Sequence, residues 1–207
     1  VLLLVADLWI PKQRKGLTAL LAVIGLAVAL GFAIAANGKT GTALNNMVVV
    51  DGFSTFLHII FLTSGIAAIA LANDYLKRMN IERGEYYVLM MFSISGMMLM
   101  AQSNNLLMVF LSLELLSIPL YVLAGFARTQ MQSEEAALKY FLLGAFASGF
   151  VMYGIALIFG ATGHIDFNGI VAAVSAGTSN SILFVIGAAF LLVGFGFKVA
   201  AVPFQMW

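Results

Sequence analysis

The chain has 207 residues, of which 62% are hydrophobic and only 9% are charged, and its formal net charge is +1. This composition is typical of a polytopic membrane protein and excludes a soluble globular domain. No basic patch interleaved with aromatic residues is present, so nucleic-acid binding is excluded as well. With no cysteine and only two isolated histidines, the sequence provides no iron–sulfur ligation and little for a metal or haem site. We therefore expect no cofactor and no redox chemistry within this chain.

The apolar run at the start of the chain ends at Pro11. It is too short to cross a bilayer, and it lacks the basic start of a signal peptide, so we interpret it as part of a helix. The chain stops at Trp207, shortly after a proline in an apolar stretch. We expect the sequence to be truncated at both ends.

Six further apolar stretches are long enough, or nearly so, to span a membrane as helices. A four-residue turn at 102–105 makes the two helices beside it antiparallel neighbours. The loop before the last crossing has room for a short surface helix. The predicted fold class is an all-α polytopic helical bundle with about six full transmembrane helices and a truncated first one. The expected crossings are 17–36, 53–72, 86–101, 106–126, 136–159 and 182–202.

The helix expected at 136–159 has a clear start signal. Ser133 is its expected N-cap, and Glu134 and Glu135 follow in the first turn, where acidic residues complement the helix dipole. Small residues recur later at i, i+4, the spacing that lets membrane helices approach closely. These pairs are Gly144 with Ser148 and Ala145 with Gly149.

Basic residues predict the orientation. Seven of the ten Lys and Arg residues lie in the loops after odd-numbered helices, and the other loops hold only Lys39. By the positive-inside rule the odd loops are cytoplasmic, so the chain starts on the outer side. We expect an integral, multi-pass protein of a bacterial inner membrane. The seven residues are Lys12, Arg14, Lys15, Lys77, Arg78, Arg83 and Arg128.

Three ionisable residues fall within the expected crossings: Glu114, Lys139 and Lys198. A charge at the centre of a membrane helix costs at least ~2.5–3.5 kcal/mol on insertion scales, so such residues usually have a partner or a function. For Glu114 we favour a role in proton transfer or ion pairing. The structural alternative is a neutral acid that is hydrogen-bonded to a hydroxyl group such as Ser112 or Ser117.

Lys198 is the candidate partner of Glu114. Its setting, GFGFKVAAVPF, predicts a kink or break, because Pro203 clashes with the carbonyl of Val199 and nearby glycines add flexibility. A broken membrane helix is tolerated where its freed backbone faces protein or a water-filled cavity. The alternative is a lysine that snorkels to the inner surface, because Lys198 lies ~24 Å from Ile182 along a straight helix.

Lys139 lies only ~4.5 Å along the helix axis from Ala136, where snorkelling or an i, i+4 pair with Glu135 also explains it. His58 stands alone on an apolar helix, and we interpret it as a packing residue. Three aspartates are interpreted as loop residues: Asp51, Asp74 and Asp166.

Three segments in this order resemble the N subunit of proton-pumping NADH:quinone oxidoreductase, respiratory complex I. They are NNLLMVFLSLELLSIPLYVLAGF, SEEAALKYFLLGAFASGFVMYGIALIFGATG and GFGFKVAAVPFQMW. The resemblance extends to VDGFS near residue 51, and it covers about the first half of a typical family member. Subunits of Mrp-type cation/proton antiporters share this fold.

The resemblance implies an antiporter-like fold of inverted five-helix repeats, with a half-channel in each repeat and discontinuous helices at its centre. Glu114 then matches the glutamate of the family's fifth helix, Lys198 the pumping lysine of the broken seventh, and Lys139 the lysine at the start of the sixth. Gln205 stands where the family usually has histidine, and glutamine cannot titrate.

The resemblance also implies one transmembrane domain, 1–207, with peripheral helices at 1–85 and most of the first inverted repeat at 86–207. The implied function is outward proton translocation by charge coupling between Glu114 and Lys198. Neighbouring antiporter-like subunits and lipid are the expected partners, while flavin, iron–sulfur clusters and quinone belong to other subunits. Two alternatives stay open: an Mrp-type cation/proton antiporter subunit, and a non-conducting membrane scaffold.

Overall fold

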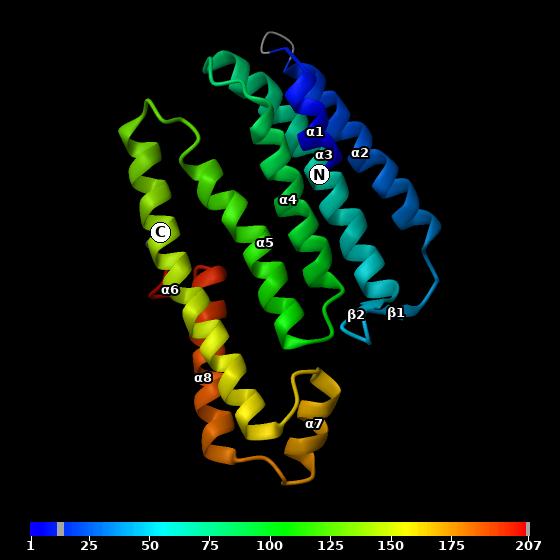
Figure 1. Ribbon diagram of the computed structural model, residues 1–207, viewed down its shortest axis with the longest axis vertical. Coiled ribbons are helices and arrows are strands. Elements are labelled where there is room, and N and C mark those ends of the chain that lie inside the picture. The colour runs from blue at the N-terminus through cyan, green and yellow to red at the C-terminus, as the bar shows by residue number, and fades with distance from the viewer. Residues whose placement is uncertain (12–14, 206–207) are drawn as a thin grey trace.

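The computed structural model describes residues 1–11 and 15–205 (Figure 1). Lys12 and Arg14, which contribute to the predicted orientation, lie outside these residues. The described residues form an α-helical bundle with one short antiparallel hairpin. The elements are α1 (Leu2–Trp9), α2 (Gly16–Ala35), β1 (Gly41–Ala43), β2 (Val48–Val50), α3 (Gly52–Arg78), α4 (Gly84–Ala101), α5 (Leu106–Ala124), α6 (Met131–Thr162), α7 (Phe167–Ser175) and α8 (Ser181–Lys198).

Six described helices, α2 to α6 and α8, are long and apolar enough to cross a membrane. They confirm the predicted bundle of six full crossings, and the short α1 precedes them. The predicted surface helix before the last crossing is α7. The hairpin was not predicted, because its strands have only three residues each and lie within a polar loop.

Three helices are longer than predicted: α3, α6 and, by two residues, α4. Helix α3 continues to Arg78, so Asp74 is helical, and the prediction that it lies in a loop is wrong. The basic residues Lys77 and Arg78 complement the helix dipole in this last turn. Helix α6 has 32 residues and ends at Thr162, where it is capped by Gly163, whose φ of 74° favours glycine. Its length of ~48 Å exceeds the ~30 Å hydrocarbon core of a bilayer, and α5 and α8 pack against it at different levels.

The predicted N-cap of α6 is wrong. Gln130 occupies that position without a side-chain cap, and Ser133 lies inside the first turn. The Ser133 hydroxyl instead donates to the carbonyl of Ala124 at the end of α5, at 2.6 Å. A carbonyl at a helix end has no partner within its own helix, so this bond both satisfies it and joins α5 to α6.

The other two aspartates lie between helices as predicted, and each caps one. Asp51 accepts a hydrogen bond from the backbone of Ser54 at 2.7 Å, and the Ser54 hydroxyl accepts one from the Asp51 backbone at 2.9 Å. This capping box starts α3. Asp166 accepts from the backbone of Gly169 at 2.7 Å and starts α7.

The helices enclose two apolar cores. The larger core lies between α2, α3 and α4, and the smaller one lies mainly between α6 and α8 and includes Leu106 of α5. His58 is buried in the first group of helices, with its Nε2 atom 3.0 Å from the carbonyl oxygen of Met98, in agreement with a packing role. In Figure 1, α8 lies along the C-terminal half of α6, while α5 lies beside the N-terminal half.

Glycines bring the backbones of α6 and α8 into contact. A Cβ atom on Gly154 would lie 2.9 Å from the carbonyl oxygen of Gly187, and one on Gly194 would lie 3.0 Å from that of Ala147. Backbone atoms cannot move aside as flexible side chains do, so these positions fix how α8 lies along α6. They therefore also fix the level at which α8 ends, at Lys198.

Candidate functional site

One face of α5 carries three polar side chains. Glu114, Ser117 and Tyr121 are spaced i, i+3 and i+7, so they form a row along the helix. Pro119 lies inside α5 and removes one backbone hydrogen bond near this row. The row faces the crossing of α5 with α6 and the C-terminal end of α8, as the contacts of its members show.

The carboxylate of Glu114 is held by a hydroxyl group from another helix. Ser148 of α6 donates to Glu114 Oε1 at 2.5 Å. The sequence suggested Ser112 or Ser117 as the hydroxyl partner, and this is wrong. Both hydroxyls donate to carbonyls of their own helix, those of Met108 and Leu113. Ser148 also lies 3.0 Å from the carbonyl oxygen of Gly144 in its own helix, and it differs from Ser112 and Ser117 because its hydroxyl also reaches the Glu114 carboxylate on the facing helix.

The ammonium of Lys198 is bound to the same face of α5. Its Nζ atom donates to Ser117 Oγ at 2.6 Å and to the Tyr121 hydroxyl at 3.0 Å. It also lies 5.4 Å from the centroid of the Tyr121 ring, within the range of a cation–π contact. Lys198 and Glu114 form no ion pair in the described part of the chain. The two charges thus share one face but are held by separate hydroxyl groups.

The bound ammonium lies at mid-height on α5. Ser117 is eleven residues beyond Leu106, which places it ~16 Å along a helix ~28 Å long. The straight-helix measurement that favoured a snorkelling lysine is therefore misleading. It assumed that α8 starts level with its neighbours, whereas α8 starts beyond the N-terminal end of α5 and ends at the level of its middle (Figure 1).

Helix α8 ends at Lys198, as the predicted discontinuity required. Ala200 adopts a left-handed φ of 52°, and the backbone N–H of Ala201 donates to the carbonyl of Gly196 at 2.9 Å. The Ala200 N–H donates to the carbonyl of Phe197 at 3.0 Å. These two bonds form a Schellman motif, which terminates helices. The helix therefore ends five residues before Pro203, and the backbone at Ala200 makes this end.

Lys139 is not brought to the other two charges. It forms an ion pair with Glu135 one turn earlier on α6, and both side chains are exposed. This is the i, i+4 pair that the spacing allowed. Ser148, which binds Glu114, lies nine residues further along α6, or ~13 Å. The assignment of Lys139 to the functional site stays a prediction.

A glycine on α6 makes room for the Tyr121 phenol. A Cβ atom on Gly144 would overlap the Tyr121 hydroxyl group and ring. Of the two small-residue pairs found in the sequence, Gly144 with Ser148 thus lies at the contact with α5. Gly149 has open space where a Cβ would stand, so the second pair does not mediate close packing in the described residues.

Asp7 of α1 is a buried charge that the sequence interpretation missed. Its carboxylate accepts hydrogen bonds from Lys15 Nζ at 2.8 Å and from the Thr18 hydroxyl at 2.5 Å. It also lies against Gly84 at the start of α4, where a Cβ atom would overlap it. An acidic and a basic residue eight positions apart, beside an apolar segment too short to span a membrane, are the signal in the sequence for this pair.

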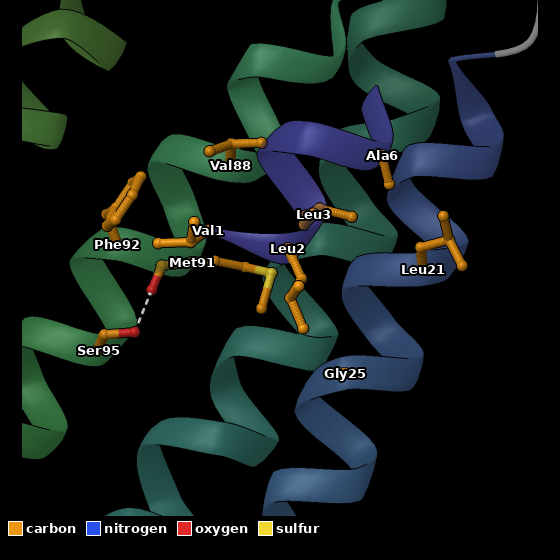
Figure 2. A pocket seen from close by; sticks show the side chains of 10 residues that line it. All are labelled: Val1, Leu2, Leu3, Ala6, Leu21, Gly25, Val88, Met91, Phe92 and Ser95. Atoms are coloured by element: carbon orange, nitrogen blue, oxygen red, sulfur yellow. Dashed lines mark hydrogen bonds between the residues drawn. The ribbon is translucent and has the colours of Figure 1, made fainter. Parts of the chain in front are cut away.

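A cavity of about 520 Å³ lies between α1, α2 and α4 (Figure 2). Its lining is apolar apart from Ser95, whose hydroxyl donates to the carbonyl of Met91 at 2.8 Å. None of the three predicted site residues lines it. Among residues 1–11 and 15–205, no group of three or more potential metal ligands is present either. The carboxyl, ammonium and hydroxyl groups of Glu114, Lys198 and Tyr121 can form hydrogen bonds and exchange protons.

A family model described as "NADH:quinone oxidoreductase/Mrp antiporter, TM" matches residues 103–207, just over half of the chain. The chain belongs to this family. The match includes α5, α6 and α8, and with them Glu114, Lys139 and Lys198. The predicted division of the transmembrane domain at residue 86 stays a prediction.

Curated proteins that match this chain include NADH-quinone oxidoreductase subunits N, which confirms the resemblance seen in the sequence. The subunit N of Chloroflexus aggregans is 50% identical over 100% of this chain and 43% of its own length. Subunit N 2 of Roseiflexus castenholzii is 45% identical over 99% of this chain and 42% of its own length. The chain therefore spans less than half the length of these relatives.

Solved structures of family members confirm the antiporter-like fold. A chain of respiratory complex I from Thermus thermophilus with bound Aureothin superposes with a TM-score of 0.80 and 34% identity, covering 99% of this chain and 43% of that one. A chain of the Mrp complex from Dietzia sp. DQ12-45-1b gives a TM-score of 0.75 at 20% identity, over 94% and 38%. The second likeness shows the shared fold alone.

Proposed function

We propose that this chain is part of a proton-translocating membrane subunit of an NADH:quinone oxidoreductase in a bacterial inner membrane. Protons move through charge coupling between Glu114 and Lys198. Neighbouring antiporter-like subunits and lipid surround it, and the redox chemistry belongs to partner subunits with flavin, iron–sulfur clusters and quinone. The absence of cysteine from this chain supports that division, because thiolates hold such clusters.

One observation carries the proposal: the Lys198 ammonium is bound at mid-height to the face of α5 that also carries Glu114. Intramembrane charges that face the bundle interior mark ion pathways by default. Ser117 is one turn from Glu114, and a lysine has a flexible four-carbon stem. The ammonium can therefore move along this face between Ser117 and Glu114 without a change in the fold.

Movement of this kind changes the proton affinity of both groups. Two unit charges 4 Å apart interact by about 4 kcal/mol at an effective dielectric constant of about 20, and this attraction weakens as they separate. In the proposed cycle a neighbouring charge draws Lys198 and Glu114 apart. The proton then leaves Lys198 Nζ for an acceptor further along the membrane domain, and the neutral amine is later reloaded. Lys139 serves as the uptake residue on the cytoplasmic side.

The decisive experiment uses the full-length subunit in the assembled oxidoreductase, reconstituted into proteoliposomes. We expect Glu114→Ala or Lys198→Ala to abolish NADH-driven proton pumping while the complex still assembles. Glu134→Ala and Lys39→Ala are matched controls, because both side chains are exposed in the structure. Normal pumping by both Glu114→Ala and Lys198→Ala would show that the proposal is wrong.

Charge exchange tests the scaffold alternative. In a scaffold, Glu114 and Lys198 serve only to hold helices together. The variant that combines Glu114→Lys with Lys198→Glu should then assemble but pump no protons. The separate hydroxyl partners of the two charges argue against such a direct lock. A sodium-dependent transport signal in the same proteoliposomes would instead indicate the Mrp-type cation/proton antiporter function.

A further inference from the structure

We propose that Tyr121 is a positioning residue that holds the Lys198 ammonium apart from Glu114, and that Gly144 provides the space in which it does so. The inference rests on the proposed function, because it concerns the distance between the two charges. It assigns the control of that distance to two residues that carry no charge themselves. Neither residue carries a charge within an expected crossing, which is the signal that marks Glu114 in the sequence.

Among the residues that the structure describes, the Tyr121 hydroxyl is one of two oxygen atoms that accept a hydrogen bond from Lys198 Nζ, at 3.0 Å. The other is Ser117 Oγ, whose own proton is donated to the carbonyl of Leu113. Both oxygens therefore present lone pairs to the ammonium. Because hydrogen bonds to a charged group are about twice as strong as neutral ones, this pair of acceptors competes with the Glu114 carboxylate for the same cation.

The Tyr121 ring is fixed in place, whereas the lysine stem is flexible. Tyr121 is buried, and its ring makes edge contacts with Tyr140 at 4.7 Å and with Phe141 at 5.8 Å between centroids. The phenol also lies over Gly144, where any larger side chain would overlap it. A movement of the ammonium toward Glu114 must therefore break the bond to Tyr121, because the phenol cannot follow.

The Glu114 carboxylate is held in the same arrangement from the α6 side. Ser148, four residues after Gly144, donates to Glu114 Oε1 and also lies 3.0 Å from the carbonyl oxygen of Gly144. One turn of α6 thus provides both Gly144, against which the Tyr121 phenol packs, and Ser148, whose hydroxyl binds Glu114. This shared support makes the α5–α6 contact the element that sets the separation of the charges.

The first test replaces Tyr121 with phenylalanine in the full-length subunit of the assembled complex. Tyr121→Phe keeps the ring packing and removes only the hydroxyl group. Loss of one hydrogen bond to a charged group shifts the balance between the two ammonium positions by about tenfold to a hundredfold. We expect electron cryomicroscopy to show Lys198 Nζ within ion-pair distance of Glu114, and pumping per NADH to fall about tenfold. Tyr153→Phe, an exposed tyrosine on α6, is the matched control.

The second test changes Gly144, against which the Tyr121 phenol packs, rather than the phenol itself. Gly144→Ala displaces Tyr121, so it should lower pumping as Tyr121→Phe does, whereas Gly149→Ala, on the same helix with open space beside it, should not. The double variant Gly144→Ala with Tyr121→Phe should pump no less than Tyr121→Phe alone, because both act through the same bond. At Ser117, alanine should lower pumping and threonine, which keeps the hydroxyl, should restore it.

A Tyr121→Phe complex that pumps normally, with Lys198 still on Ser117, would overturn the inference. Independent, additive losses from Gly144→Ala and Tyr121→Phe would also overturn it, because they would indicate a purely structural effect. Failure here is distinct from failure of the proposed function. In the first case Glu114→Ala and Lys198→Ala still abolish pumping, and in the second they leave it unchanged.

Discussion

The Lys198 ammonium is bound by Ser117 on α5, one turn beyond Glu114, whose carboxylate is bound by Ser148 on α6. The two hydroxyl groups thus hold opposite charges apart on one helix face. Because backbone contacts fix α8 along α6, a small shift of α6 relative to α5 changes both the bond of Glu114 to Ser148 and the bond of Lys198 to Ser117. The arrangement therefore makes both charges depend on how α6 packs against α5.

Removal of the Ser148 hydroxyl should impair pumping. In Ser148→Ala, Glu114 loses the one side-chain hydrogen bond that the structure gives it, a loss of about 1.5–3 kcal/mol for a bond to a charged group. We expect pumping at neutral pH to fall about tenfold, and Ser148→Thr to retain it, as measured in proteoliposomes. Ser95→Ala is the matched control, because the Ser95 hydroxyl donates only to its own helix (Figure 2). Equal effects of Ser148→Ala and Ser95→Ala would contradict the prediction.

The buried pair of Asp7 and Lys15 should be sensitive to loss of one partner. Their side chains are only 8% and 12% exposed, so Lys15→Met leaves the Asp7 carboxylate buried and without its cation. Such a loss costs about 3–5 kcal/mol. We expect a lower thermal inactivation temperature of the purified complex for Lys15→Met, and recovery of most of the loss when Asp7→Asn is added. Losses that simply add in the double variant would show that the two residues do not act as a pair.

The start of α3 should depend on pH through Asp51. Hydrogen bonding, chiefly from the backbone N–H of Ser54, lowers the pKa of the Asp51 carboxyl from its ordinary value of 3.8. A carboxyl whose pKa is lower in the folded state stabilises the fold above its ordinary pKa, and this contribution is lost as the pH falls through the lower, folded value. We expect faster opening of the first turn of α3 at about pH 3 than at about pH 6, measured by hydrogen exchange relative to intrinsic rates.

Asp51→Asn separates capping from charge in that experiment. Asparagine caps helices about as well as aspartate but does not titrate. The variant should therefore keep the protection of the first turn of α3 and lose its dependence on pH over the same range. An unchanged pH dependence in Asp51→Asn would assign the effect to another group.

Hydropathy and charge predicted the crossings and the three intramembrane ionisable residues, because both are properties of single segments. The partners of Glu114 and Lys198 depend on which helix faces face one another, and one segment does not contain that information. The i, i+3, i+7 row of Glu114, Ser117 and Tyr121 was readable on α5. That Ser148 supplies the hydroxyl for Glu114 follows only from the packing of α6 on α5.

The level of Lys198 illustrates the same limit. Its distance along α8 was correct, but the position of α8 along α6 is set by backbone contacts such as that between Gly154 and Gly187. Glycines with helical spacing indicate that two helices approach closely and do not indicate at which level. The predicted break was right for a related reason: Pro203 and the glycines disfavour a continuous helix, whereas the stop itself is made by the backbone of Ala200.

The stop at the end of α8 gives a last prediction. Ala200 has a left-handed φ of 52°, which costs an L-residue about 1–2 kcal/mol and costs glycine little. Ala200→Gly should therefore raise the thermal inactivation temperature of the complex and leave pumping unchanged. Ala200→Val adds a β-branched side chain to the strained position, so it should disrupt the stop, move Lys198 away from Ser117 and Tyr121, and lower pumping severalfold. Ala201→Val is the control, because the neighbouring residue is also exposed and has no left-handed backbone. If Ala200→Val and Ala201→Val pump alike, the backbone stop at Ala200 does not position the lysine.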